Sequence, residues 1–210
     1  MAKECSCPSC GAPVLFRSPA SILAVCSYCS STIVRQDVNL ELVGKMAELM
    51  SDGSPIQLGT TGRYREAPFT VVGRIQLRYP QGFWNEWHML LGDERSGWLG
   101  ESMGNYGVSF ITPVPEKVPA FQDLKAGQQV LLKGAVYEVT DLENASCIGG
   151  EGELPFQIGP GFSAPAADLS GPGNAFASID YSEEPPLVYL GEYVDFKELH
   201  LSGLRQLNGW

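Results

Sequence analysis

Cys7-Pro8-Ser9-Cys10 begins the stretch that decides the fold of the N-terminal region, and Cys26-Ser27-Tyr28-Cys29 completes it after fifteen intervening residues. Each Cys-x-x-Cys closes a tight turn that presents two thiolates, and two such turns complete a tetrahedral metal site. The sequence therefore predicts a structural zinc ion held by Cys7, Cys10, Cys26 and Cys29. Because four sulfur ligands leave no open coordination position, we expect this metal to stabilise the fold and to catalyse no hydrolysis.

Residues 1–36 are predicted to form a zinc ribbon with short strands near 14–16, 22–25 and 32–34. Gly11 lies where a metal-binding turn needs a positive φ, and Ser30 occupies the matching position in the second turn, at a strain of about 1 kcal/mol. A core this small cannot offset the chain entropy of the ribbon, so the metal is expected to supply much of its folding free energy. Cys5 is separated from Cys7 by one residue, which makes a poor metal-binding turn. We therefore expect Cys5 to be an inert or oxidisable thiol and not a metal ligand.

Residues 37–54 are predicted to form a connecting amphipathic helix and a linker. Asp37 can act as an N-cap, and Val38, Leu42, Met46 and Leu49 recur at spacings of three and four residues. We expect this apolar stripe to pack on the next domain. A dimerisation or partner-binding helix is the alternative.

The composition indicates a folded, acidic protein. The 210 residues are 44% hydrophobic and 18% charged, with a net charge of -10. Such a charge disfavours phosphate backbones and anionic lipid, and residues 1–54 contain four basic against five acidic side chains, so no nucleic-acid partner is expected. The chain has no signal-like N-terminus and no run of eighteen apolar residues, so we expect a cytoplasmic protein without a transmembrane segment.

Residues 55–210 are predicted to form a second, β-rich domain, either an antiparallel sandwich or a barrel-like sheet. Short apolar runs bounded by turn residues are typical of strands, whereas residues 149–153 are expected to form a turn and residues 159–174 an irregular loop. The expected strands cover 56–58, 69–77, 84–91, 108–114, 130–132, 136–139 and 187–194. In the second of the long runs, alternation places Trp87, Met89 and Leu91 on one face and Glu86 and His88 on the other.

Several of these runs resemble a known bacterial family. The segments that carry the resemblance are Phe69-Thr70-Val71-Val72-Gly73, Trp84-Asn85-Glu86-Trp87-His88-Met89-Leu90, Trp98-Leu99, Tyr137-Glu138-Val139, Gly152-Glu153-Leu154-Pro155 and Tyr189-Leu190-Gly191-Glu192-Tyr193. Together they are similar to domain of unknown function 4178, over about residues 56 to 200. The resemblance implies no established activity. It does imply a frequent N-terminal zinc ribbon and a genomic neighbourhood of polyamine-synthesis enzymes and membrane-stress proteins of the phage-shock type.

The sequence contains no nucleophile elbow, no phosphate-binding loop and no dinucleotide-binding fingerprint. Glu183 and Glu184 are adjacent, so on a strand they would point to opposite faces and could not converge on one substrate. Cys147 has no histidine partner in view and is expected to be a small buried side chain. The remaining candidate is an aromatic and acidic block that either lines a groove for a peptide, a nucleobase or a small cationic ligand such as a polyamine, or forms core: Trp84, Glu86, Trp87, Trp98 and Glu101.

These observations favour a non-enzymatic bacterial adaptor or binding protein. In this hypothesis a structural zinc ribbon supports a β domain that binds a protein partner or a small cationic ligand. The alternatives are an enzyme that uses carboxylates of the β domain and a nucleic-acid-binding zinc ribbon. Loss of Cys26 is expected to release zinc and loosen residues 5–35 while the β domain stays folded.

Overall fold

The structure is a computed structural model that describes residues 3–36, 39–80, 82–114, 116–159 and 161–206. Its fold is mainly antiparallel β and is built around one twenty-residue strand, β12 (Ala135–Leu154). Along its length β12 pairs in turn with β11 (Gln129–Leu132), β13 (Ser163–Ser170), β7 (Ala67–Tyr79) and β3 (Leu23–Val25). This strand therefore joins strands that precede it in the sequence, β3, β7 and β11, to β13, which follows it.

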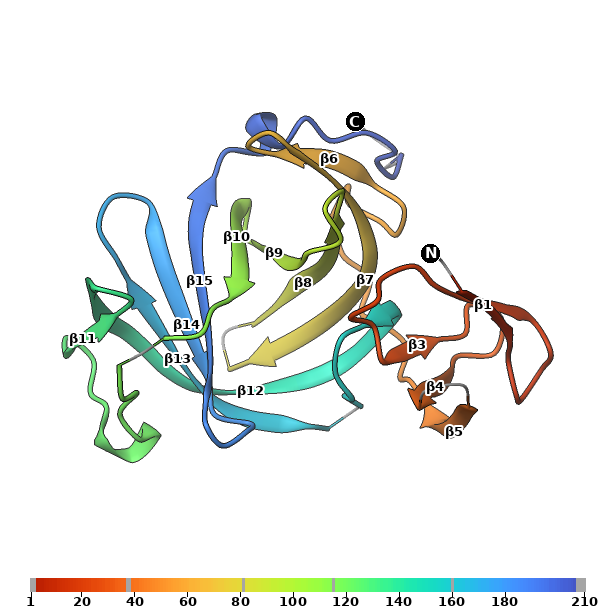
Figure 1. The fold of residues 1–210 in the computed structure, drawn as a ribbon, viewed down its shortest axis with the longest axis horizontal. Coiled ribbons are helices and arrows are strands. Elements are labelled where there is room, and N and C mark those ends of the chain that lie inside the picture. Colours follow the sequence, from red (N-terminus) through yellow and green to blue (C-terminus); the bar gives the residue numbers. More distant parts are fainter. Residues whose placement is uncertain (1–2, 37–38, 81, 115, 160, 207–210) are drawn as a thin grey trace.

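Eight strands form a closed ring in which β12 joins β7 on one side and β13 on the other (Figure 1). Closure pairs most of the strand edges along this ring, which limits edge-to-edge association, and residues 141–146 of β12 pair with β13 on one side only. The predicted antiparallel β domain is confirmed, in its barrel-like form. The order around the ring is β7, β8 (Gly82–Leu91), β9 (Ser96–Ser102), β10 (Asn105–Ile111), β15 (Leu187–Val194), β14 (Ala175–Asp180), β13 and β12.

The N-terminal module, as we call residues 3–36 and 39–45, lies beside the ring (Figure 1). It comprises a two-stranded sheet of β1 (Lys3–Ser6) and β2 (Pro13–Phe16), and the strands β3, β4 (Ser31–Gln36) and β5 (Asn39–Lys45). The pairs Val25↔Gly152 and Leu23↔Leu154 join β3 to β12. The module and the ring are thus parts of one continuous hydrogen-bonded sheet.

The predicted connecting helix is wrong. Residues 39–45 form the edge strand β5, and residues 46–58 contain no helix. Leu42 and Met46 fit a helical period, but Leu40 and Leu42 fit the period of two of a strand, and β4 offers a partner in which Ile33 lies opposite Leu42. Asp37 and Val38, the expected start of the helix, lie outside the described residues. The helical segments that the described residues do form are two short 3-10 helices, η1 (Phe121–Asp123) and η2 (Phe196–Leu199).

Two further expectations about the β domain are corrected. Residues 149–153 continue β12 and do not turn, and residues 163–170 form β13 where an irregular loop was expected. The glycines of residues 149–153 allow close packing of the backbone, because a Cβ on Gly152 would lie 2.3 Å from the carbonyl oxygen of Val72 and one on Gly149 would lie 2.5 Å from that of Ala47. Residues 56–58 form no strand, whereas β6 (Thr61–Tyr64), β9 and β14 are strands that the apolar runs did not predict.

The ring strands have an outer face covered by loops and an inner face that points into the ring. Register assigns the faces, because residues opposite each other on paired strands share a side. On the outer face, segment 113–132 covers Leu169 and Ile179, and Ile56 and Leu199 cover Trp87 and Leu99. In the part of the chain that is described, no helix has the length and apolar character needed to cross a membrane.

Candidate functional site

The four cysteines of the two Cys-x-x-Cys turns converge in the N-terminal module. Their Sγ atoms all lie within 4.8 Å of one another, and the Cys7–Cys29 and Cys10–Cys26 sulfur pairs are each 3.7 Å apart. A tetrahedral ion bound by four thiolates at about 2.3 Å requires sulfur separations of about 3.8 Å. The predicted cluster is therefore formed, and its dimensions suit one metal ion.

Both turns have the same backbone geometry. The amide of Gly11 donates to the carbonyl of Cys7, and the amide of Ser30 donates to the carbonyl of Cys26, each at 2.9 Å. Gly11 has φ +75° and Ser30 has φ +57°. The expectation that Ser30 adopts the strained left-handed conformation is confirmed. The metal turn therefore forms against a local backbone cost.

Glu153 fastens the N-terminal module to the ring. Its side chain is buried and accepts hydrogen bonds from the backbone amides of Arg17 and Ser18 at 2.6 and 3.1 Å, while the Arg17 guanidinium pairs with it at 3.1 Å. The carbonyl of Glu153 contacts Nδ1 of His88 at 2.8 Å. Burial lowers the pKa of His88 to about 4, so this imidazole is neutral and donates from Nδ1. His88 is thus a structural link between the module and β8.

Strand alternation divides the five residues predicted for a ligand site. Trp84 and Glu86 lie on the inner face of β8, where the indole Nε1 donates to Glu86 at 2.8 Å. Trp98 is also on the inner face, but it is buried and stacks on Phe156 with ring centroids 5.5 Å apart. Trp87 and Glu101 lie on the outer face and are buried. The structure therefore does not bring the five together.

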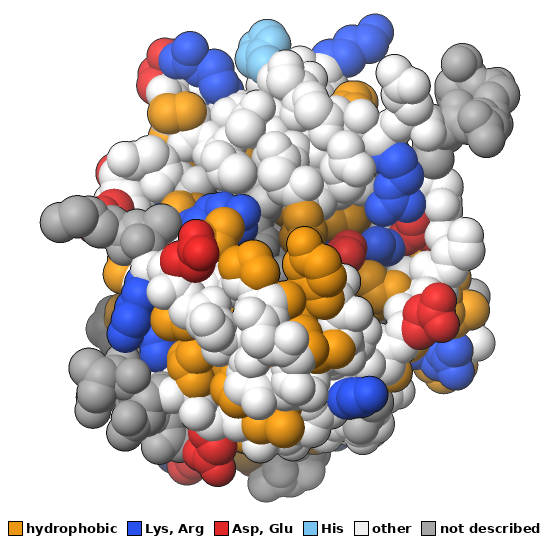
Figure 2. Space-filling model, turned by 90° about the vertical axis from the view of Figure 1, so that its right-hand side faces the viewer, with side chains coloured by type: hydrophobic (Ala, Val, Ile, Leu, Met, Phe, Trp, Pro, Cys, Tyr) orange, Lys and Arg blue, Asp and Glu red, His pale blue; other side chains and the backbone are white. Residues whose placement is uncertain are grey.

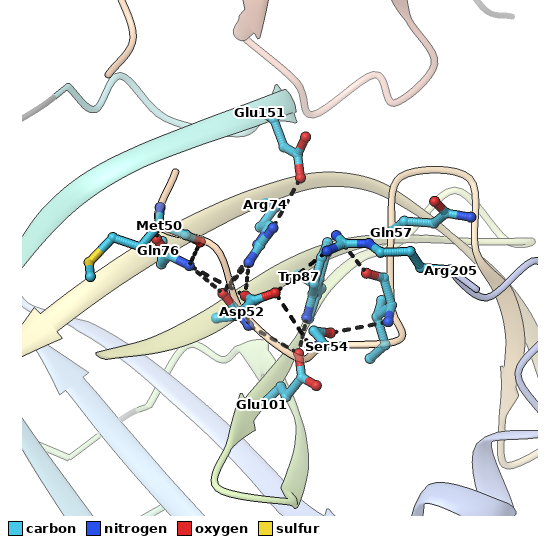
Figure 3. Close-up of polar contacts among 12 residues, drawn as sticks. Met50, Asp52, Ser54, Gln57, Arg74, Gln76, Trp87, Glu101, Glu151 and Arg205 are labelled. Carbon is cyan, nitrogen blue, oxygen red and sulfur yellow. Dashed lines mark hydrogen bonds and ion pairs between the residues drawn. The ribbon is translucent and has the colours of Figure 1, made fainter. Parts of the chain in front are cut away.

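The outer pair belongs to a buried polar network (Figure 3). Trp87 Nε1 donates to Glu101 at 2.9 Å, and the Arg74 guanidinium lies 4.5 Å from the centre of the Trp87 ring. Asp52, from the segment after β5, accepts from Arg74 and from Asn85 Nδ2, the latter at 2.9 Å. This network anchors the segment around residue 52 on the outer face of the ring, and its members have a structural role.

The inner face gathers carboxylates that the sequence did not single out. Glu86 on β8 and Asp168 on β13 interact electrostatically although their strands are not neighbours, which places both within the ring. Among the described inward positions of the ring strands, none is Lys or Arg. Among the described residues, the inward carboxylates are Glu86, Glu138, Asp141, Glu143, Asp168 and Asp180.

A family model for a domain of unknown function, DUF4178, matches residues 57–196. The chain belongs to this family. No curated protein matches the chain, and no solved structure matches it. The matched range begins after the N-terminal module and contains the whole ring, so the DUF4178 domain is the part that carries the inner carboxylates.

The interior of the DUF4178 domain disfavours negative charge. Burial raises the pKa of Glu86 to about 7, with a smaller contribution from Asp168. Burial raises the pKa of Asp168, a hydrogen bond from Ser178 opposes this rise, and the charge of Asp141 adds to it. Burial and then the charges of Asp141 and Asp168 raise the pKa of Glu143. Asp168 nevertheless stays exposed to solvent. A carboxylate that is surrounded by protein and still reaches water indicates an interior that a ligand or solvent can enter.

Aromatic side chains line the same interior of the DUF4178 domain. Phe176 and Tyr193 contact each other with ring centroids 4.9 Å apart. Glycine makes room for Phe176, because a Cβ on Gly107 or Gly191 would lie 2.8 or 2.6 Å from its ring. Tyr193 also lines a hollow of about 290 Å³ together with Asn105 and other residues. A larger hollow of about 570 Å³ is lined by Arg63, His200 and others, and none of the six inward carboxylates lines either hollow.

Sequence reasoning missed most of this inner set, although a signal exists. Asp141 and Glu143, and likewise Ser178 and Asp180, stand two residues apart and so share a face when the segment is a strand. Polar alternation of this kind escapes a search for apolar runs. Glu183 and Glu184, the adjacent pair considered for catalysis, are exposed between β14 and β15. Cys147 is buried, as expected.

Proposed function

We propose that this chain is a non-enzymatic bacterial adaptor or binding protein that binds a small cationic ligand on the inner face of the ring in its DUF4178 domain. The observation that carries the proposal is six inward carboxylates without an inward Lys or Arg among the described residues. An uncompensated set of this kind attracts cations, and the rings of Trp84 and Tyr193 add cation–π attraction. A polyamine such as spermidine has the matching charge and shape, and the neighbourhood implied by the family resemblance agrees with this choice.

The metal in the N-terminal module is proposed to be structural zinc. Four cysteine sulfurs are the soft ligands that zinc accepts in a closed tetrahedral site, and this donor set leaves no position for a substrate. In a cytoplasmic setting, which we also propose, reduced thiols bind metal in preference to forming disulfides. The zinc would hold the two turns together and supply no reaction.

Glu86→Gln is expected to weaken spermidine binding by about 10-fold to 100-fold, because it removes one charged hydrogen-bond acceptor. Since the pKa of Glu86 is about 7, the affinity of the unmodified protein should rise between pH 6 and pH 8, as this carboxyl loses its proton. Isothermal titration calorimetry at both values checks the prediction. The variant should lose most of the pH dependence along with the affinity.

The same substitution has a predicted effect on stability with a worked sign. Because the pKa of Glu86 is about 7 in the folded protein and 4.5 ordinarily, the free protein loses stability as pH rises from about 4.5 to about 7. Glu86→Gln should therefore stabilise the free protein at pH 8, by on the order of 2 kcal/mol. Glu101→Gln is the matched control, since Glu101 is buried on the outer face. This substitution should change the stability of the protein and leave its affinity for spermidine unchanged. Equal binding by unmodified protein and Glu86→Gln would contradict the proposal.

Binding of a protein partner to the N-terminal module is a second candidate. Tyr28 is 75% exposed, and Leu42 and Val43 on the edge strand β5 are each 48% exposed. Figure 2 shows hydrophobic side chains gathered over the lower half of this side of the molecule. A partner identified by affinity capture from the native host should be lost with Leu42→Ser and retained with Leu131→Ser, an equally exposed residue of β11. Retention by both variants would argue against this surface.

A further inference from the structure

The N-terminal module supplies part of the packing inside the ring. Leu23 of β3 and Val34 of β4 are buried in the same cluster as Ile75 and Trp98, whose side chains point inward from β7 and β9. Tyr189 packs against this cluster and also interacts electrostatically with Glu86. The apolar end of the interior and its acidic part are therefore in contact through shared side chains.

The metal ligands lie next to the strands that make this contact. Cys26 follows directly after Val25, the last residue of β3, and its amide donates to the carbonyl of Ser31, the first residue of β4, at 2.9 Å. Because Cys26 is bonded directly to Val25, a displacement of the cysteine turn moves the strand that carries Leu23. This strand in turn pairs with β12 through Val25↔Gly152. The four thiols, when they hold an ion, fix the position of both strands.

We propose that metal occupancy of the four cysteines sets how tightly the inner face of the ring holds a ligand, with the N-terminal module acting as a plug at the apolar end of the interior. Metal held by the four thiols keeps Leu23 and Val34 against Ile75 and Trp98 and closes that end of the interior. Loss of the metal releases β3 and β4 and opens the apolar end. Coupling of this kind is reciprocal, so a ligand on the inner face also strengthens metal binding. The ligand side of the inference rests on the proposed function.

Cys147 provides a readout that needs no ligand. Its side chain is buried in the shared cluster and belongs to neither cysteine pair. Alkylation by iodoacetamide, mapped to Cys147 by peptide mass spectrometry, should be at least about 10-fold faster after removal of the metal by a chelator than in the loaded protein. Equal rates of Cys147 alkylation in the two forms would overturn the proposal.

Two variants separate the plug from general loss of structure. Leu23→Ala keeps all four cysteines and removes a contact of the shared cluster, whereas Val14→Ala removes an apolar group buried only in the core of the module. With metal bound in both, Leu23→Ala should expose Cys147 to alkylation several-fold faster, and Val14→Ala should not. The same rate in both variants would refute the plug even if metal removal unfolded the whole chain.

Spermidine titrations distinguish failure of this inference from failure of the proposed function. The affinity for spermidine should fall at least about 10-fold on metal removal, and added spermidine should raise the zinc affinity measured at equilibrium against a chromogenic chelator by the same factor. If spermidine binds neither form while Cys147 becomes reactive on metal removal, the proposed ligand is wrong and the plug stands. If spermidine binds both forms equally tightly, metal occupancy does not control the inner face.

Discussion

Cys26→Ser is expected to abolish metal binding and to unfold the N-terminal module while the ring keeps its strands at reduced stability. Cys26 is buried, and its sulfur lies 3.7 Å from that of Cys10 in the four-thiol cluster. A structural site of this type contributes on the order of 10 kcal/mol to the folding of a small module, more than the core around Phe16 and Ile33 can replace. Metal content should fall from one ion per chain to near zero.

The ring is expected to survive because its closure does not use the module. β12 pairs with β7 and β13 through residues 138–152, whereas β3 pairs only with residues 152–154. The ring does lose Leu23 and Val34 from the shared cluster, so its melting temperature should drop. Far-ultraviolet circular dichroism and a thermal melt measure both effects.

Cys5→Ser is the matched control for this experiment. Cys5 lies on β1 opposite Val14 and is not among the four sulfurs that cluster. It should keep one metal ion per chain and the original melting temperature. Metal loss in Cys5→Ser would show that Cys5 is a ligand, and an unchanged melt of the ring in Cys26→Ser would show that the module contributes nothing to its stability.

The parts of the fold that the sequence predicted are those fixed by local chemistry. Cys-x-x-Cys spacing predicted the cluster, and a positive φ at Ser30 followed from the turn that the metal needs. The prediction of a helix within 37–54 was wrong because the sequence fits two periods. Leu42 and Met46 fit a helical period, whereas Leu40 and Leu42 fit a strand. Only pairing with β4, a tertiary contact, decides between the two.

The inner face was harder to predict because it depends on ring closure. A strand of twenty residues such as β12 changes partners three times, and no local pattern reports which partner takes which residue. Alternation in β8 correctly separated Glu86 from Trp87. It could not show that Glu86 would meet Asp168 from a strand some eighty residues further along the chain.

Asp52→Ala is expected to destabilise the protein by about 3 kcal/mol or more, because it leaves the Arg74 guanidinium buried without its main counterion. The Arg74 side chain is 4% exposed and the Asp52 side chain 10% exposed. Asn85 Nδ2 also loses its 2.9 Å acceptor, and Arg205 loses a carboxylate 3.6 Å away. For a chain of this size the melting temperature should fall by on the order of 10 °C.

The size of this effect should depend on the buried charge and not on the lost contacts alone. Glu151 lies 3.4 Å from Arg74 but is 38% exposed, so solvent weakens its compensation. Replacing both partners, as Asp52→Ala with Arg74→Met, removes the stranded charge and should be less destabilising than Asp52→Ala alone. Asp93→Ala removes a carboxylate from the exposed Arg95 pair and should shift the melting temperature by less than about 2 °C. If the double variant is no more stable than Asp52→Ala, the network around Asp52 stabilises the fold through shape and hydrogen bonds, and the charge of Arg74 is not what makes Asp52 necessary.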